Sequence, residues 1–195
     1  MAESSSLAAP SEAGNADLTR HVFRIAPLIR LTLLLLYLSL MGPLPVLAQA
    51  TQAAVPPLGL TAGILLGGIG LYGALGQRVE VDSDGIQVTY PAWIRWLFRS
   101  SWQLAWADVQ ALKPRSTGQG GIVYYFVGVD QQAYLLPMRV AGFARLVELV
   151  QTHTGLDTQD VKPLAQPWMY FILLGFTLLL LLVDVWTITT ALTLA

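Results

Sequence analysis

The side chains that could carry chemistry are few in this sequence. His21 and His153 are the only histidines and lie too far apart to indicate a metal cluster. The absence of cysteine excludes disulfides, thiolate nucleophiles, iron–sulfur ligation and zinc ribbons. His153 stands near the end of a predicted helix, where a solvated residue favoured by the helix dipole is the usual finding. Glu80, Asp82 and Asp84 alternate along one predicted strand, which is typical of a solvated face. We therefore expect no catalytic residue, no metal site and no cofactor.

Two glycine-rich segments carry parts of anion-binding motifs without the surrounding structure that those motifs need. Residues 68–73 spell GxGxxG, but they lie inside an apolar stretch and follow no strand, so no helix N-terminus is placed for a pyrophosphate. Residues 116–121 could offer backbone amides to an anion beside Lys113 and Arg115. They lack a Walker lysine pattern and a neighbouring metal-binding acid, so a flexible hairpin loop explains them better.

The chain also contains three long segments without charged residues. Residues 31–47, 55–76 and 163–183 contain no Asp, Glu, Lys or Arg, and 54% of the chain is hydrophobic. A bilayer core needs about 20 apolar helical residues to span it, and helix is the form that satisfies backbone groups in lipid. The sequence therefore predicts a polytopic membrane protein with three transmembrane helices.

The first of these segments has two interpretations. Residues 48–50, Ala-Gln-Ala, follow the leucine-rich run as a signal-peptidase site would. The leader before the run, however, is long and carries Glu3, Glu12 and Asp17, whereas a secretory leader is short and basic. We favour a retained helix, and a cleaved signal remains the alternative.

Basic residues indicate the orientation. They flank the first two apolar segments on one side, and the turn at residues 48–57 carries no charge. By the positive-inside rule, the N-terminus and residues 77–166 are expected in the cytoplasm and the C-terminal tail on the far side. The residues concerned are Arg20, Arg24, Arg30, Arg78, Arg95, Arg99, Lys113 and Arg115.

The second apolar segment contains glycines at four-residue spacing, Gly59, Gly63 and Gly67. Small residues let helix backbones approach closely in lipid, so these glycines are predicted to be helix-packing residues. Either the first apolar segment packs there as a hairpin, or a partner protein does. In the third segment, Trp168 and Trp186 have the placement of aromatic-belt residues, and Asp184 is an acid expected near the far interface.

Between the second and third segments the pattern changes to alternation with a period of two, which indicates strands. Phe143, Leu146, Val147 and Val150 then form a helical stripe, and Gly155 stands at the C-cap position. We expect an antiparallel sheet closed by one helix. The predicted strands are 79–82, 86–90, 102–105, 109–113, 122–129 and 133–136, with a turn at 83–85.

The sequence thus predicts an α+β membrane protein in four parts. Residues 1–24 form a disordered tail, residues 25–76 a transmembrane hairpin, residues 77–166 a cytoplasmic domain, and residues 167–195 a third transmembrane helix with a short tail. The net charge of -1 gives no indication of a nucleic-acid partner.

Residues 91–102 are the most unusual part of the predicted cytoplasmic domain, because they join two strands and concentrate aromatic and arginine side chains. Tryptophan and arginine are typical of interface hot spots and of anchors at headgroup level. A contact with a partner or the membrane is therefore one interpretation, and completion of a small core by the aromatic rings is the other. The candidate contact residues are Trp93, Arg95, Trp96, Phe98 and Arg99.

Three short motifs make the chain resemble the photosystem I assembly protein family of cyanobacteria and plastids, or a related bacterial membrane protein with a pleckstrin-homology-like domain. They occur in the same order and at similar spacing within residues 31–158, and the third apolar segment is a difference from that family. The motifs are Asp84-Gly85-Ile86-Gln87-Val88, Asp108-Val109-Gln110-Ala111-Leu112-Lys113 and Leu136-Pro137-Met138-Arg139.

The resemblance implies a pleckstrin-homology-like fold for residues 77–166 and the role of a non-enzymatic assembly factor or scaffold. Its partners would be membrane lipids and subunits of a membrane complex, which the resemblance gives as photosystem I in the thylakoid. Two alternatives remain. A lipid-headgroup-binding or regulatory module would use Lys113 with Arg115 and Arg95 with Arg99. A small transporter subunit would need Asp184 on its path.

Overall fold

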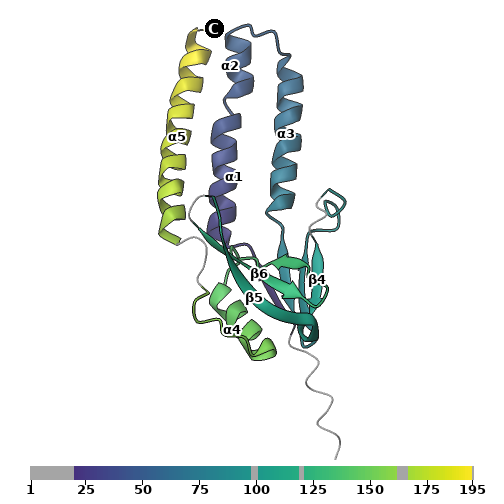
Figure 1. Cartoon of the computed structure of the whole chain (residues 1–195). Helices are drawn as coiled ribbons and strands as arrows, with labels where there is room; N and C mark the ends of the chain where they lie inside the picture. Colours follow the sequence, from purple (N-terminus) through teal and green to yellow (C-terminus); the bar gives the residue numbers. More distant parts are fainter. Residues whose placement is uncertain (1–19, 98–100, 119–120, 162–166, 195) are drawn as a thin grey trace, which may run out of the picture.

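A computed structural model describes residues 20–97, 101–118, 121–161 and 167–194. The chain folds into a bundle of long apolar helices at one end and a compact α+β part at the other (Figure 1). The helices are α1 (Pro27–Met41), α2 (Leu44–Ala50), α3 (Pro57–Ala74), α4 (Phe143–Thr154) and α5 (Pro167–Leu194).

Among the described residues, three helical segments are long and apolar enough to cross a membrane. They are Pro27–Ala50 with 24 residues, Pro57–Ala74 with 18, and Trp168–Thr193 with 26. The C-terminal end of α5 lies beside the turn between α2 and α3, at the end of the bundle away from the sheets (Figure 1). The prediction of three long apolar helices is confirmed.

The first apolar segment is not one unbroken helix. Proline at position 43 has no backbone N–H to donate, and α1 ends just before it while α2 begins just after it. Gly42 lies so close to the preceding turn that a Cβ atom there would be 2.6 Å from the carbonyl oxygen of Leu38. The two helices still run nearly in line, so the segment keeps its length (Figure 1).

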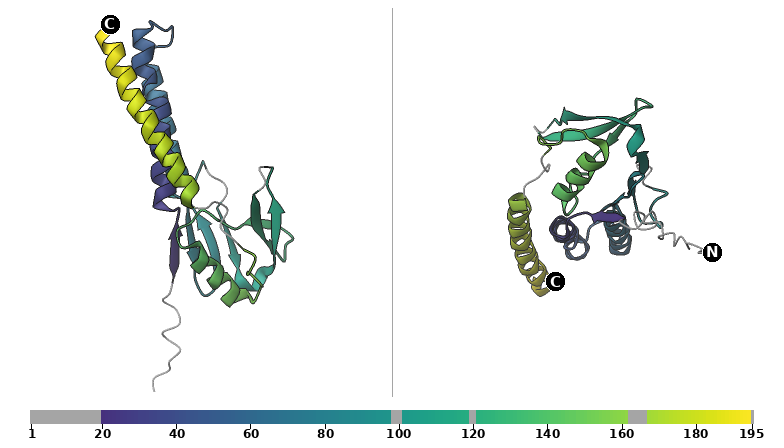
Figure 2. Two further views of the ribbon diagram at one scale, coloured as in Figure 1. Left: turned by 90° about the vertical axis from the view of Figure 1, so that its left-hand side faces the viewer. Right: turned by 90° about the horizontal axis from the view of Figure 1, so that it is seen from below.

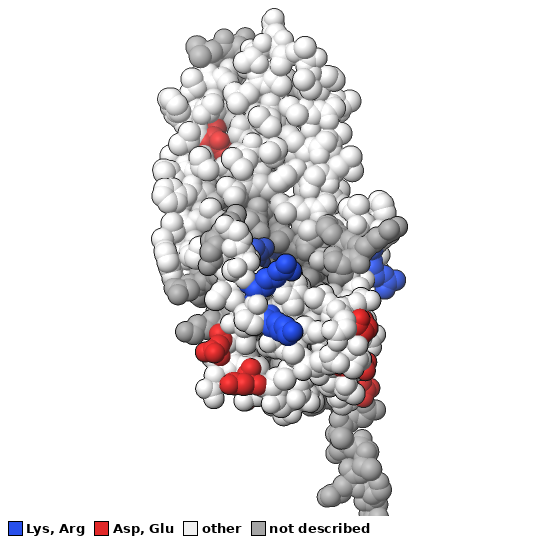
Figure 3. Space-filling view, viewed as in Figure 1, with Lys and Arg blue, Asp and Glu red and all other residues white. Residues whose placement is uncertain are grey.

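Charge is distributed very unevenly over the molecule. Figure 3 shows a helical part almost without charged side chains, apart from one acidic patch. Lysine and arginine side chains gather over the α+β part where it meets the helices, and acidic side chains lie farther away. This distribution is the one expected when the helices are surrounded by lipid and basic groups reach the headgroups.

In the part of the chain that the structure describes, seven strands form two antiparallel sheets. The first sheet has the order β1-β2-β3-β4 and the second the order β5-β6-β7. A short 3-10 helix, η2 (Trp106–Asp108), joins them. The strands are β1 (His21–Arg24), β2 (Arg78–Val81), β3 (Gly85–Thr89), β4 (Trp102–Ala105), β5 (Val109–Ser116), β6 (Ile122–Gly128) and β7 (Ala133–Leu135).

The core lies between the sheets and α4, around which the strands curve (Figure 2). Ile86, Phe126 and Leu146 from the two sheets and α4 are completely buried. The predicted apolar stripe of α4 faces this core, and the helix ends at Gly155 with a φ of 68°, a left-handed conformation that glycine adopts readily. The α+β class, the antiparallel sheets and the closing helix are confirmed.

The predicted disordered tail, residues 1–24, was placed too far along the chain. His21–Arg24 form β1, an edge strand that pairs with β2 and covers its free edge. The backbone N–H of Ala26 also donates to the carbonyl of Arg139 at 3.1 Å, which fixes the start of α1 to the connection between β7 and α4. The strand is short and only Phe23 is buried in it, so the period-two signal was too weak to indicate it.

Candidate functional site

The candidate site begins with the turn at residues 91–97, between β3 and β4. Its backbone is compact because the amides of Ile94 and Arg95 both donate to the carbonyl of Pro91, at 3.0 and 3.1 Å. The amide of Leu97 donates to the carbonyl of Ile94 at 2.9 Å. We call residues 91–97 the aromatic turn.

Gly73 of α3 and Gly76, just past the end of that helix, leave room for the aromatic turn to pack against the helix. Ile94 is only 3% exposed, and a Cβ atom on Gly73 would collide with its side chain and lie 2.8 Å from the Trp93 ring. Three residues later, just past the end of α3, a Cβ atom on Gly76 would lie 2.6 Å from Pro91. The aromatic turn therefore rests in a gap that only glycine leaves open. The sequence showed a glycine run here, but nothing in it paired these two glycines with a turn distant in the chain.

The aromatic rings of the turn point away from the core. Trp93 is 48% exposed and Trp96 is 78% exposed, and the indole N–H of Trp96 donates to the carbonyl of Trp93 at 3.1 Å. Arg95 is exposed as well. Of the candidate contact residues, Phe98 and Arg99 lie outside the described residues. Within the described part, the buried side chain of this segment is that of Ile94, so the two tryptophans do not complete the core.

The three glycines predicted to pack helices have different surroundings. A Cβ atom on Gly67 would lie 2.5 Å from the hydroxyl of Tyr37, which itself donates to the carbonyl of Ile64 at 2.7 Å. Gly67 therefore serves the contact between α3 and α1 within the chain. Gly59 would touch only Pro56 of its own turn, and Gly63 has open space around it.

Asp184 is the acid of α5, and one of its carboxylate oxygens is buried without a hydrogen-bond partner in the described part of the chain. Trp168 and Trp186 are exposed on the same helix. The basic pair Lys113 and Arg115 lies exposed on β5, in the second sheet, whereas the aromatic turn follows β3 of the first.

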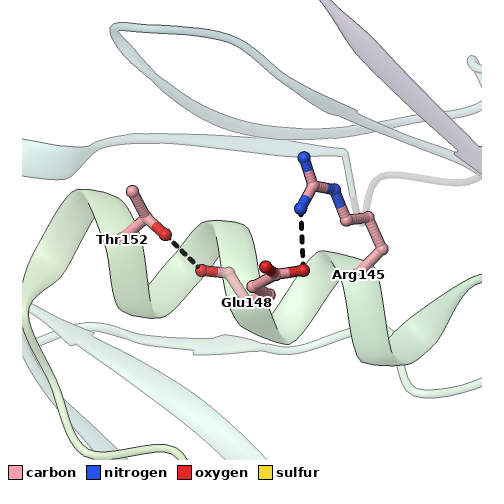
Figure 4. A network of polar contacts seen from close by, with 3 residues as sticks. All are labelled: Arg145, Glu148 and Thr152. Atoms are coloured by element: carbon pink, nitrogen blue, oxygen red, sulfur yellow. Dashed lines mark hydrogen bonds and ion pairs between the residues drawn. The ribbon is translucent and has the colours of Figure 1, made fainter.

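The titratable groups of the α+β part have ordinary structural roles. His153 is exposed and stacks on Trp106 with ring centroids 5.1 Å apart. On the outer face of α4, Arg145 donates to Glu148 at 2.7 Å and the Thr152 hydroxyl to the Glu148 carbonyl at 2.8 Å (Figure 4). No group of three or more acidic or histidine side chains could hold a metal ion within the described ranges.

The pKa of Tyr134 is perturbed by its surroundings. Its hydroxyl donates to Asp130 at 2.8 Å. This hydrogen bond is the main cause that raises the pKa of Tyr134 above its ordinary value of 10.0, and desolvation and the charges of Asp130 and Asp108 add to it. The same hydrogen bond links β7 to the turn before it.

Comparison with known proteins gives one informative relative. An uncharacterized protein of the cyanobacterium Synechocystis sp. (strain PCC 6803), slr0269, is 58% identical over 163 residues, which cover 83% of this chain and 82% of that protein. The chain belongs to the slr0269 family. No family model matches the chain, and no solved structure matches it significantly. The slr0269 family thus has a cyanobacterial member, and its shared sequence extends over most of both chains.

Proposed function

We propose that this protein is an integral membrane protein with three transmembrane helices and a cytoplasmic domain of pleckstrin-homology-like fold. The support is the length and apolarity of the three helical segments, and the gathering of basic groups where the α+β part meets them (Figure 3). A four-stranded and a three-stranded antiparallel sheet closed by α4 support the fold. The N-terminus and the domain face the cytoplasm, and the C-terminus faces the opposite side.

The orientation predicts the result of reporter fusions. A reporter joined after Ala165 should be located in the cytoplasm, and a reporter joined at Ala195 should be located on the far side of the membrane. The reason is that α5 lies between these two positions. The measurement pairs an alkaline phosphatase fusion with a green fluorescent protein fusion at each position. Both reporters in one compartment would remove the third span from this account.

The protein acts, in this proposal, as a non-enzymatic assembly factor or scaffold for a membrane protein complex. The observation that carries it is the aromatic turn, which holds Trp93, Arg95 and Trp96 exposed beside the end of α3 while Ile94 fixes the backbone. Rigid, exposed tryptophan and arginine side chains are characteristic of interface hot spots, because little conformational freedom is lost when a partner binds. Gly63 has open space around it, so a helix of a partner protein could pack closely against α3 at this position.

The client proposed first is photosystem I, and the membrane is the thylakoid. This choice follows the resemblance expected from the three sequence motifs, and the cyanobacterial member of the slr0269 family is the observation that supports it. The accumulation of mature photosynthetic complexes in a strain without the gene tests this proposal.

A further inference from the structure

A basic cavity lies between the first sheet and the ends of the helices. Its volume is about 540 Å³, and its wall comes from β1, α1, α3, β2, β3 and the aromatic turn. Three arginines of this wall, Arg24, Arg30 and Arg78, come from three different elements. None of them forms an ion pair with an acid among the described residues. A concave site with three convergent, unpaired positive charges fits an anion.

The strand register places two arginines directly opposite each other, and a bound anion would relieve their repulsion. Arg24 of β1 is directly opposite Arg78 of β2, and Thr89 of β3 follows in the same row. Directly opposed like charges on one face of a sheet destabilise the pairing. The nearest acid on that face of β2, Glu80, is occupied by an ion pair with Arg20. An oxyanion between Arg24 and Arg78 would turn the repulsion into two charge-assisted hydrogen bonds.

The third arginine is held in place by an aromatic ring. The guanidinium carbon of Arg30 lies 4.4 Å from the centroid of the Tyr72 ring, a cation–π contact between α1 and α3. This contact fixes the side chain at the cavity and leaves N–H groups of the guanidinium free to donate. A planar fork held in this way is suited to a phosphate or sulfate ester.

An apolar groove continues from this cavity along the helices. It has a volume of about 580 Å³ and lies between α1 and α3. Tyr72 and Trp93 line both hollows, so the groove and the basic cavity are adjacent. The hydroxyl of Tyr37, which also lines the groove, already donates to the carbonyl of Ile64. The remaining wall is built from apolar side chains and glycine: Leu34, Leu38, Ile64, Leu65, Gly68 and Ile69.

We infer that the two hollows together form a binding site for one anionic glycerolipid. The phosphate or sulfonate of its headgroup lies among Arg24, Arg30 and Arg78, and an acyl chain follows the groove between α1 and α3. A free inorganic anion would fill only the basic cavity and leave the apolar groove uncovered. A zwitterionic lipid would fill the groove but bring its own cation toward the three arginines. An anionic lipid places its negative headgroup in the basic cavity and an acyl chain in the apolar groove.

The inference rests on the proposed membrane location and is independent of the proposed assembly role. It also differs in its residues from the lipid-binding alternative that the sequence offered, which used Lys113, Arg115, Arg95 and Arg99. The assay below uses the purified full-length chain. Its outcome therefore does not depend on the phenotype of a strain without the gene.

The test measures lipid binding to the purified full-length protein in detergent by native mass spectrometry. Phosphatidylglycerol should bind as one retained molecule and phosphatidylcholine should not. The double variant Arg24→Gln/Arg78→Gln should weaken phosphatidylglycerol binding by about tenfold or more, since two charge-assisted contacts are lost. The control Lys113→Gln/Arg115→Gln removes the same charge from exposed positions on β5 and should bind as the parent does.

A second arm separates a lipid from a free anion. Leu65→Trp places a larger side chain in the groove at an exposed position, so it should weaken phosphatidylglycerol binding and leave the arginines untouched. Glycerol 3-phosphate should compete poorly with the lipid, because it cannot occupy the groove. If glycerol 3-phosphate competed as well as the lipid itself, and Leu65→Trp had no effect, the ligand of the site would be a free phosphate ester and not a lipid. Equal binding of both lipids would overturn the inference.

Thermal unfolding provides a readout that a merely misfolded variant would not reproduce. Without anionic lipid, Arg24→Gln should raise the Tm, because it removes a like-charge pair. With phosphatidylglycerol present, the same variant should have a lower Tm than the parent, because the parent gains binding energy that the variant lacks. A variant that is less stable in both conditions would show that Arg24 has a structural role only, and the lipid site would be abandoned.

Discussion

Replacing Gly73 with leucine is expected to detach the aromatic turn from α3. The leucine Cβ alone would collide with Ile94, and the rest of the side chain would need the space that Ile94 and Trp93 occupy. Forcing extra atoms into a packed contact costs about 1–3 kcal/mol, which is large for a seven-residue turn held mainly by this contact. The amides of Ile94, Arg95 and Leu97, protected by the hydrogen bonds of the turn, should then exchange about tenfold faster or more. Hydrogen exchange of the peptide that spans the turn measures this directly.

Gly70→Leu is the matched control for this variant. Gly70 belongs to the same helix and has nothing within 4 Å of an added Cβ atom, so its replacement should leave the exchange of the turn unchanged. Equal exchange rates in both variants and the parent would mean that Gly73 does not hold the turn.

Replacing Trp93 and Trp96 with serine should remove most client binding while the protein stays folded. Neither ring belongs to the buried core, so the α+β part should remain folded when both are replaced. As hot spots, they would each contribute about 2 kcal/mol or more to binding, so recovery of client subunits should fall by at least about tenfold. The measurement is quantitative mass spectrometry of proteins that co-purify with a tagged copy in mild detergent.

Two further variants make this result specific. Trp186→Ser removes a ring of similar exposure, 68%, from α5 and should leave client recovery intact. Trp96 lines neither the basic cavity nor the groove, so Trp96→Ser alone separates client contact from lipid binding. Aggregation of the double variant would assign the rings to the core, and undiminished recovery would move the client contact away from the aromatic turn.

The elements that the sequence predicted well are those with a strong local period. Val79, Val81, Ile86 and Val88 alternate with polar residues, and all four are buried in the β2–β3 hairpin. The stripe of α4 repeats at helical spacing and ends at a glycine with a positive φ. In these segments the hydrophobic pattern and the turn chemistry agree, so burial follows from the order of the residues alone.

The features that the sequence could not predict depend on partners distant in the chain. Residues 21–24 form β1 because they pair with the free edge of β2. Gly73 is needed because the side chain of Ile94, distant in the sequence, packs where a Cβ atom would lie. The opposition of Arg24 and Arg78 requires the strand register, which no local pattern specifies. The composition of residues 91–97 indicates the aromatic turn, but it does not tell whether the tryptophan rings are buried in the core or exposed. The structure answers this, because Ile94 is the buried side chain and the tryptophans are exposed.

The accumulation of membrane complexes in a strain without the gene tests the assembly role most directly. An assembly factor acts on intermediates, so deletion should lower mature photosystem I while transcripts of its subunits and the activity of the remaining complex stay normal. The parent gene should restore the level, and a gene encoding the Trp96→Ser variant, which leaves the wall of the lipid site intact, should restore it less well. The level is measured in isolated membranes under low and high light. Normal amounts of photosystem I, photosystem II and the cytochrome complex in a clean deletion strain under both conditions would contradict the assembly role.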